Sequence, residues 1–127
     1  MKYSPKQIEK YRRQKYIAQL EKIGKNLFRF LRNPETRAEE LLNRFDELMK
    51  KLDEMETIRL DTEYLRESEA HYRRLQEEWH GARFDARRLE EVREAEMSNL
   101  NRLQKMKNRS SYRKEKHRKH AQRDGWE

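Results

Sequence analysis

Apolar side chains recur every three or four residues along most of the chain, which is the spacing of one face of an α-helix. In the first 33 residues this series consists of Tyr16, Leu20, Ile23, Leu27 and Phe30. Ser4, Pro5 and Gln7 precede it with the residue types that start a helix and close a capping box. The pattern predicts a helix that ends near Arg32. Gly24 weakens its interior by about 1 kcal/mol relative to alanine, which is tolerable where a neighbour packs close.

The clearest break follows at Pro34, because proline disfavours helical conformation in the residue before it. A link this short makes the next helix an antiparallel neighbour of the first, so the two are predicted to form a hairpin. We expect the cations of the first helix, Lys22, Lys25 and Arg29, to face acids of the second across this hairpin. These acids include Glu35, Glu39, Asp46 and Glu47.

The apolar series then continues from residue 38 to about residue 106, a stretch with no proline and one glycine, Gly81. Its positions are Leu41, Phe45, Leu48, Leu52, Met55, Ile58, Thr62, Leu65, Tyr72, Leu75, Trp79, Ala82, Ala86, Leu89, Val92, Leu100 and Leu103. This periodicity predicts one coiled-coil-forming helix over residues 34–107, roughly 100 Å long at 1.5 Å per residue. A turn at His80 and Gly81 is the alternative. Because no good N-cap residue follows directly, we expect the helix to continue.

The composition agrees with helices that bury a narrow seam. Hydrophobic residues make up 33% of the 127, charged residues 44%, and glycine and proline are scarce, whereas a compact globule has nearer half its residues apolar. The predicted fold is therefore all-α: a basic N-terminal helix over residues 1–33, a very long acidic helix over 34–107, and a disordered basic tail over 108–127.

The distal part of the long seam has no partner in this arrangement, because the first helix is too short to reach it. We therefore expect a second copy of the chain or another protein to cover it. The predicted protein interface consists of Tyr72, Leu75, Trp79, Phe84, Leu89, Val92, Leu100 and Leu103.

The net charge of +8 is unevenly distributed. Residues 1–33 hold ten Lys and Arg against two acids, a net charge of +8, and residues 99–127 hold ten against three, a net charge of +7. The intervening residues 34–98 hold twelve against nineteen, a net charge of −7. Basic ends around an acidic centre predict phosphate contacts at the two ends only.

Clustered cations with nearby aromatic side chains are suited to nucleic acid, since they release counterions from phosphates and stack on unpaired bases. The predicted nucleic-acid-binding residues are Lys105, Lys107, Arg109, Tyr112, Arg113, Lys114, Lys116, Arg118, Lys119 and Arg123 near the C-terminus, with Lys6, Lys10 and Arg13 near the N-terminus. An acidic protein partner, or a purely solubilising role, are the alternative interpretations of the tail.

Several classes of function lack the residues they need. The chain has no cysteine, and its four histidines lack further ligands nearby, so no metal site and no cofactor are expected. No glycine-rich phosphate loop or catalytic triad is present, so no enzymatic activity is expected. Without a signal peptide or a membrane-spanning run of apolar residues, the protein is expected in the cytoplasm or in a particle assembled there.

These patterns favour a non-enzymatic helical assembly or accessory protein that binds nucleic acid through its basic ends, such as a subunit of a nucleoprotein or viral particle. The alternative is a protein-binding coiled-coil adaptor or chaperone that docks on a larger machine.

Overall fold

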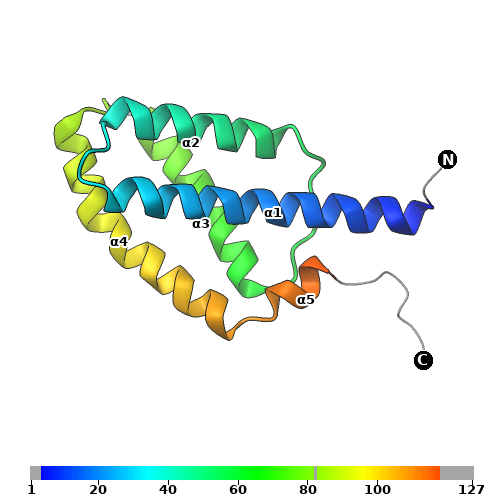
Figure 1. Cartoon of the computed structure of the whole chain (residues 1–127). Coiled ribbons are helices and arrows are strands. Elements are labelled where there is room, and N and C mark those ends of the chain that lie inside the picture. The colour runs from blue at the N-terminus through cyan, green and yellow to red at the C-terminus, as the bar shows by residue number, and fades with distance from the viewer. Residues whose placement is uncertain (1–3, 82, 118–127) are drawn as a thin grey trace.

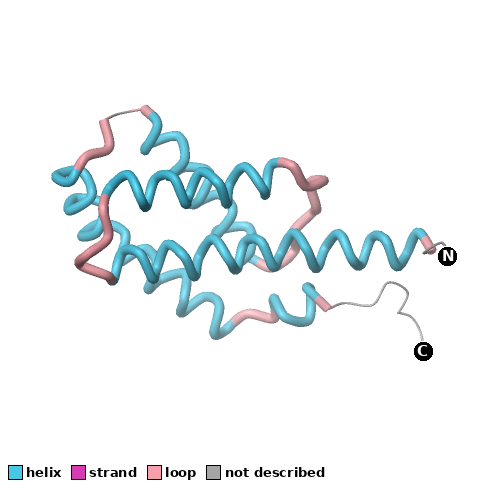
Figure 2. The backbone as a smooth tube through the Cα atoms, turned by 45° about the horizontal axis from the view of Figure 1, so that its top comes forward, coloured by secondary structure: helices cyan, strands magenta, loops and turns pink. Residues whose placement is uncertain are grey.

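The computed structural model describes residues 4–81 and 83–117, and in these ranges the fold is all-helical. Its helices are α1 (Pro5–Arg32), α2 (Ala38–Asp53), α3 (Glu63–His80), α4 (Ala86–Arg109) and α5 (Tyr112–Lys116). In Figure 1, α1 and α2 run antiparallel as one pair, and α3 and α4 form a second pair that crosses behind them. Figure 2 shows that the first turns of α1 extend beyond the other helices.

The predicted start of α1 is confirmed in detail. The Ser4 hydroxyl accepts from the Gln7 N–H at 3.2 Å, and the Gln7 side-chain oxygen accepts from the Ser4 N–H at 2.9 Å. A neighbour does pack close to Gly24, because a Cβ at this position would lie 2.6 Å from the hydroxyl oxygen of Tyr72. Gly24 thus leaves room for the end of the Tyr72 side chain against α1.

The single long helix over residues 34–107 was a wrong prediction, because the chain turns at residues 54–62 and again at 81–85. The second turn is the alternative at Gly81 that the sequence analysis set aside. The N-cap residue that the sequence lacks directly after Gly81 is found at Asp85, whose carboxylate accepts from the Arg88 N–H at 3.0 Å. The cap therefore exists, but it follows Gly81 by four residues.

The two turns fold the distal seam back onto α1 and α2, so the seam becomes a core. All but one of the residues predicted as a protein interface are buried within the chain: Tyr72, Leu75, Trp79, Leu89, Val92, Leu100 and Leu103. The exception, Phe84, is half-buried with its ring centroid 5.2 Å from that of Trp79. These residues are covered by the chain itself and leave no distal seam for a partner.

A buried polar pair joins α3 to α4 inside this core. His71 Nε2 lies 2.6 Å from Glu96 Oε1, and Arg74 contacts His71 Nδ1 at 2.8 Å. Since an arginine can only donate, Nδ1 accepts and Nε2 carries the proton that is donated to Glu96. The pair satisfies two buried polar groups and fixes the register of α3 on α4.

The predicted disordered tail begins with folded structure. Residues 112–116 form α5, and the Tyr112 side chain is only 4% exposed. The rest of that tail, residues 118–127, lies outside the described residues. Within residues 4–81 and 83–117, every helix is too short or too polar to span a lipid bilayer.

Candidate nucleic-acid interface

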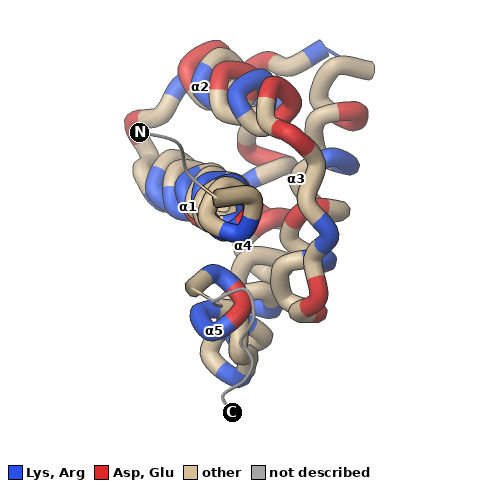
Figure 3. The backbone as a smooth tube through the Cα atoms, turned by 90° about the vertical axis from the view of Figure 1, so that its right-hand side faces the viewer, with Lys and Arg blue, Asp and Glu red and all other residues tan. Residues whose placement is uncertain are grey.

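The two basic ends of the chain, far apart in the sequence, lie side by side because α5 docks on α1 (Figure 3). Glu21 of α1 binds two residues of α5 and holds one side of α5 against α1. Its carboxylate accepts from the Tyr112 hydroxyl at 2.9 Å and lies 2.6 Å from Lys116 Nζ. The Tyr112 ring also packs edge-on against Tyr64, with 5.2 Å between the ring centroids.

Glu115 fastens the opposite side of α5 to the turn before α3. Its carboxylate accepts from the backbone N–H of Asp61 at 2.8 Å and of Thr62 at 2.7 Å, and also from the Thr62 hydroxyl. Its backbone carbonyl accepts from Arg13 Nε at 3.1 Å. A carboxylate at the start of α3 is also favoured by the helix dipole. One α5 residue therefore joins α1, α3 and the turn between α2 and α3.

The charge of Glu21 is maintained by its two partners. Burial opposes ionisation of this carboxyl, but the hydrogen bonds from Lys116 and Tyr112 outweigh it, and the pKa of Glu21 is lowered. The carboxylate is consequently charged at neutral pH and neutralises Lys116. This lysine holds α5 in place and is not available for a phosphate.

Two further residues of the predicted set have the same structural role. Arg13 is only 4% exposed and directs its guanidinium at α5 and at Glu9, 3.7 Å away. Tyr112 is buried against α1 and α3, so its ring cannot stack on a base while α5 stays docked. Contacts of Arg13, Tyr112 and Lys116 therefore hold α5 beside α1 and so help to form the basic surface.

The remaining predicted cations that the structure describes lie at or near the surface. Those with exposed side chains are Lys6, Lys105, Arg109, Arg113 and Lys114, and those with half-buried side chains are Lys10 and Lys107. Arg118, Lys119 and Arg123 lie outside the described residues. The described members come from α1, from the end of α4 and from α5.

A row of cations along α1 adds to this surface. Lys15, Lys22, Lys25 and Arg29, here termed the α1 ridge, recur at helical spacing on the exposed face of α1, opposite the core. Lys15 and Arg29 are about 21 Å apart at 1.5 Å per residue. The ridge therefore presents positive charge along much of the helix.

The expected pairing of this row with acids of α2 was wrong. Asp46 is bound by His80 at 2.7 Å, and Glu47 by Arg44 at 3.4 Å. Within the described part of the chain, neither Lys22 nor Lys25 forms an ion pair. The α2 acids are matched by other partners, so the charge of the α1 ridge faces solvent.

Tyr11 extends the α1 ridge toward the N-terminus and was missed by the sequence analysis. Its side chain is 60% exposed, and Lys15 Nζ lies 5.4 Å from the centroid of its ring. The signal in the sequence is its phase, because Tyr11 precedes Tyr16 by five residues and so falls off the apolar stripe. An exposed ring between lysines is suited to stacking on a base.

The chain matches no protein-family model, no curated protein and no solved structure.

Proposed function

We propose that this protein is a non-enzymatic helical accessory protein that binds nucleic acid through the α1 ridge together with the exposed cations of α5 and the end of α4. The observation that carries the proposal is the docking of α5 on α1 by Glu21 and Glu115, which gathers cations from both basic ends. A subunit of a nucleoprotein or viral particle is a role that fits this arrangement.

Electrostatics determine what such a surface recognises. Lysine is a compact point charge on a flexible stem, so a row of lysines neutralises phosphates without reading base identity. Each neutralised phosphate releases counterions, and the logarithm of the binding constant falls by about 0.7 to 0.9 per contact for each unit of log salt concentration. We therefore expect salt-dependent binding with little sequence preference.

The decisive experiment compares two charge-reversal variants of equal net charge. Lys15→Glu/Lys22→Glu reverses two members of the α1 ridge, and Arg37→Glu/Arg87→Glu reverses two exposed cations at the starts of α2 and α4. Binding to a fluorescein-labelled 20-nucleotide strand is measured by anisotropy between about 50 and 200 mM salt. The ridge variant should bind at least about tenfold more weakly with a smaller salt slope, while the control stays near wild type.

Equal losses in the two variants would contradict the proposal, because net charge alone would then account for binding. The C-terminal contribution is tested separately by removing residues 118–127, a deletion that retains α5 and the contacts of Glu115. Deleting all of residues 108–127 is a poorer experiment, since it also removes the groups that hold the turn before α3.

A protein-binding adaptor is the second candidate, and it is favoured by the exposed apolar side chains on the first turns of α1. Ile8 is 37% exposed and Tyr11 60% exposed, and both belong to the first two turns of α1. An acidic protein surface would complement the surrounding lysines. The anisotropy experiment separates the two candidates, since an adaptor of this kind has no need to bind the oligonucleotide.

A further inference from the structure

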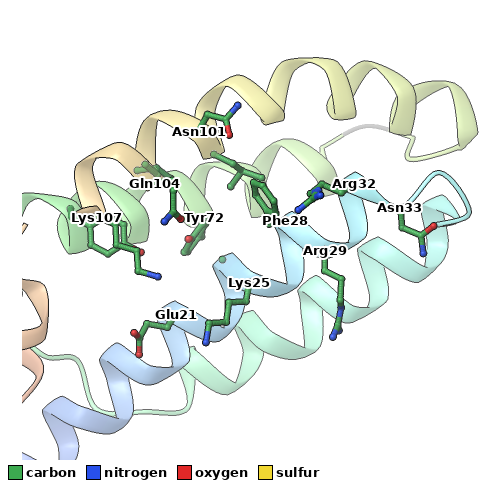
Figure 4. Close-up of a pocket in the computed structure, with 14 residues that line it drawn as sticks. Glu21, Lys25, Phe28, Arg29, Arg32, Asn33, Tyr72, Asn101, Gln104 and Lys107 are labelled. Carbon is green, nitrogen blue, oxygen red and sulfur yellow. The ribbon is translucent and has the colours of Figure 1, made fainter. Parts of the chain in front are cut away.

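A pocket of about 610 Å³ opens between α1, α3 and α4 (Figure 4), within the size range of sites that hold small organic groups. Its apolar wall includes Phe28 of α1, Tyr72 of α3 and Leu100 of α4. In Figure 4, Phe28 projects from α1 toward α4, and Gln104 points from α4 toward Tyr72, whereas the Asn101 amide points away from α1. The pocket thus combines an aromatic wall with the side-chain amide of Gln104, which can both donate and accept hydrogen bonds.

The rim of the pocket is positively charged. Lys25, Arg32 and Lys107 all line it, and the Arg32 guanidinium is held 5.2 Å from the centroid of the Phe28 ring. The acid among the lining residues, Glu21, is already bound by Lys116 and Tyr112. An anionic group at the rim therefore meets cations without a competing free carboxylate from the lining.

The pocket is continuous with the α1 ridge, because Lys25 and Arg29 belong to both. A nucleic-acid backbone that follows the ridge therefore passes the mouth of the pocket. In a duplex the bases are paired and stacked inside the helix and cannot turn outward without an unstacking cost of a few kcal/mol. In a single strand they are free to leave the backbone and stack on protein aromatic rings.

We infer that the pocket accepts an unpaired base of single-stranded nucleic acid, with the base against Phe28 and the flanking phosphates at Lys25 and Lys107. This inference rests on the proposed function and makes it more specific, since the four cations of the ridge do not distinguish a single strand from a duplex. Aromatic and amide groups occur together at the pocket, whereas the ridge offers cations and the exposed ring of Tyr11.

The test changes the mouth of the pocket without adding an aromatic ring, because a tryptophan there would itself stack on bases. Gln104→Leu replaces the amide at the opening by a branched apolar side chain, and Ala95→Leu places the same side chain at an exposed site nine residues earlier, on the opposite side of α4 at about 100° per residue. Both variants and the wild type are titrated with a labelled 15-nucleotide oligothymidine and with a 15-base-pair duplex at one salt concentration. Circular dichroism checks that both variants fold.

The wild type should prefer the single strand by at least about fivefold, the discrimination that one stacked base provides. Gln104→Leu should lower single-strand affinity toward the duplex level and leave duplex affinity unchanged, and Ala95→Leu should resemble the wild type. Phe28→Leu provides a second, independent variant, because it keeps an apolar side chain but removes the aromatic face. It should lose about fivefold in single-strand affinity only.

The outcomes separate this inference from the proposed function. Equal wild-type affinity for the two oligonucleotides overturns the pocket inference and leaves the ridge proposal standing. A single-strand preference that survives both Gln104→Leu and Phe28→Leu also overturns it, and places the stacking elsewhere, for example at Tyr11. Failure of the wild type to bind either oligonucleotide overturns both.

Discussion

The turn between α2 and α3 and the turn between α3 and α4 reverse the chain in similar ways but are held by different interactions. At residues 54–62 the backbone N–H groups of Asp61 and Thr62 bind the carboxylate of Glu115, which lies more than 50 residues away in the sequence. At residues 81–85 the corresponding group is Asp85, which binds the N–H of Arg88 in the first turn of α4. The carboxylate that caps α3 comes from α5, whereas the carboxylate that caps α4 is local.

This difference links the C-terminal segment to the fold. Because Glu115 holds the start of α3 and Glu21 holds Lys116 and Tyr112, α5 stabilises the α2–α3 turn while it carries basic residues to α1. The capping hydrogen bond after the α3–α4 turn is local to α4. Perturbing the first turn should therefore affect both stability and the proposed nucleic-acid surface, whereas perturbing the second should affect stability alone.

The largest effect is expected from Glu115→Ala. The substitution leaves the N–H groups of Asp61 and Thr62 without their buried acceptor, and hydrogen bonds to a charged group contribute about 1.5 to 3 kcal/mol each. Allowing for partial access of water, we expect a loss of about 3 kcal/mol in the free energy of unfolding, measured by urea denaturation. Lys114→Ala, at an exposed neighbouring position on α5, should change stability by less than about 0.5 kcal/mol. Similar stabilities for the two variants would show that α5 is dispensable to the turn.

A smaller, pH-dependent effect is expected at Glu21. The pKa of Glu21 is lowered in the folded protein from its ordinary value of 4.5, so its contribution to stability is present above that value and is lost as the pH falls through the lowered pKa. At pH 7, Glu21→Gln should destabilise the protein by about 1 kcal/mol, a figure that already allows for solvent screening of this partly exposed pair. The difference in Tm between wild type and variant should shrink toward zero below pH 4.5. A constant difference at all pH values would mean that the charge of Glu21 does not hold α5.

The two turns also show which parts of the fold the sequence could predict. The Ser4 capping box was predicted correctly, because it follows from residue types at fixed local spacing. Asp85 is a local cap of the same kind, and a search extended four residues beyond Gly81 would have found it. The role of Glu115 has no local signal, because its partners are backbone N–H groups brought near by the folded chain.

The same distinction applies to the candidate site. Charge counting along the sequence identified the basic ends, but it could not separate exposed Lys114 from Lys116, which is bound to Glu21. The apolar periodicity of the distal seam correctly indicated that this helix face is covered. Periodicity does not show, however, which element or molecule covers it. Its apolar residues were therefore assigned to a partner, although two turns bring α1 and α2 over them.

A modest effect is expected from Asp85→Ala, which removes the cap of α4. The carboxylate accepts from the Arg88 N–H, and this hydrogen bond is the main cause of the lowered pKa of Asp85. The Tm should fall by less than in Glu115→Ala, and binding of the 20-nucleotide strand should be unchanged. Asp85→Asn keeps a side-chain acceptor oxygen and should stay close to wild type. A loss as large as that of Glu115→Ala would remove the proposed contrast between the two turns.

The smallest effect is expected from Gly81→Ala, which tests whether glycine itself interrupts the helix. Gly81 has φ −80° and ψ −9°, a right-handed conformation that alanine adopts readily. Alanine gains roughly 0.5 to 1 kcal/mol of helical preference over glycine. Its Cβ would, however, lie 3.2 Å from the carbonyl oxygen of Glu77, which offsets part of that gain.

Joining α3 to α4 as one straight helix would pull the buried α4 residues off the core: Leu89, Val92, Leu100 and Leu103. Exposing each such side chain costs about 1.5 to 3 kcal/mol, so their sum far exceeds the gain from one alanine. The turn should therefore persist in Gly81→Ala, with unfolding free energy within about 1 kcal/mol of wild type and an unchanged radius of gyration by small-angle X-ray scattering. An increase in both helix content and radius of gyration would show that Gly81, and not the packing of α4 on α1 and α3, sets the turn.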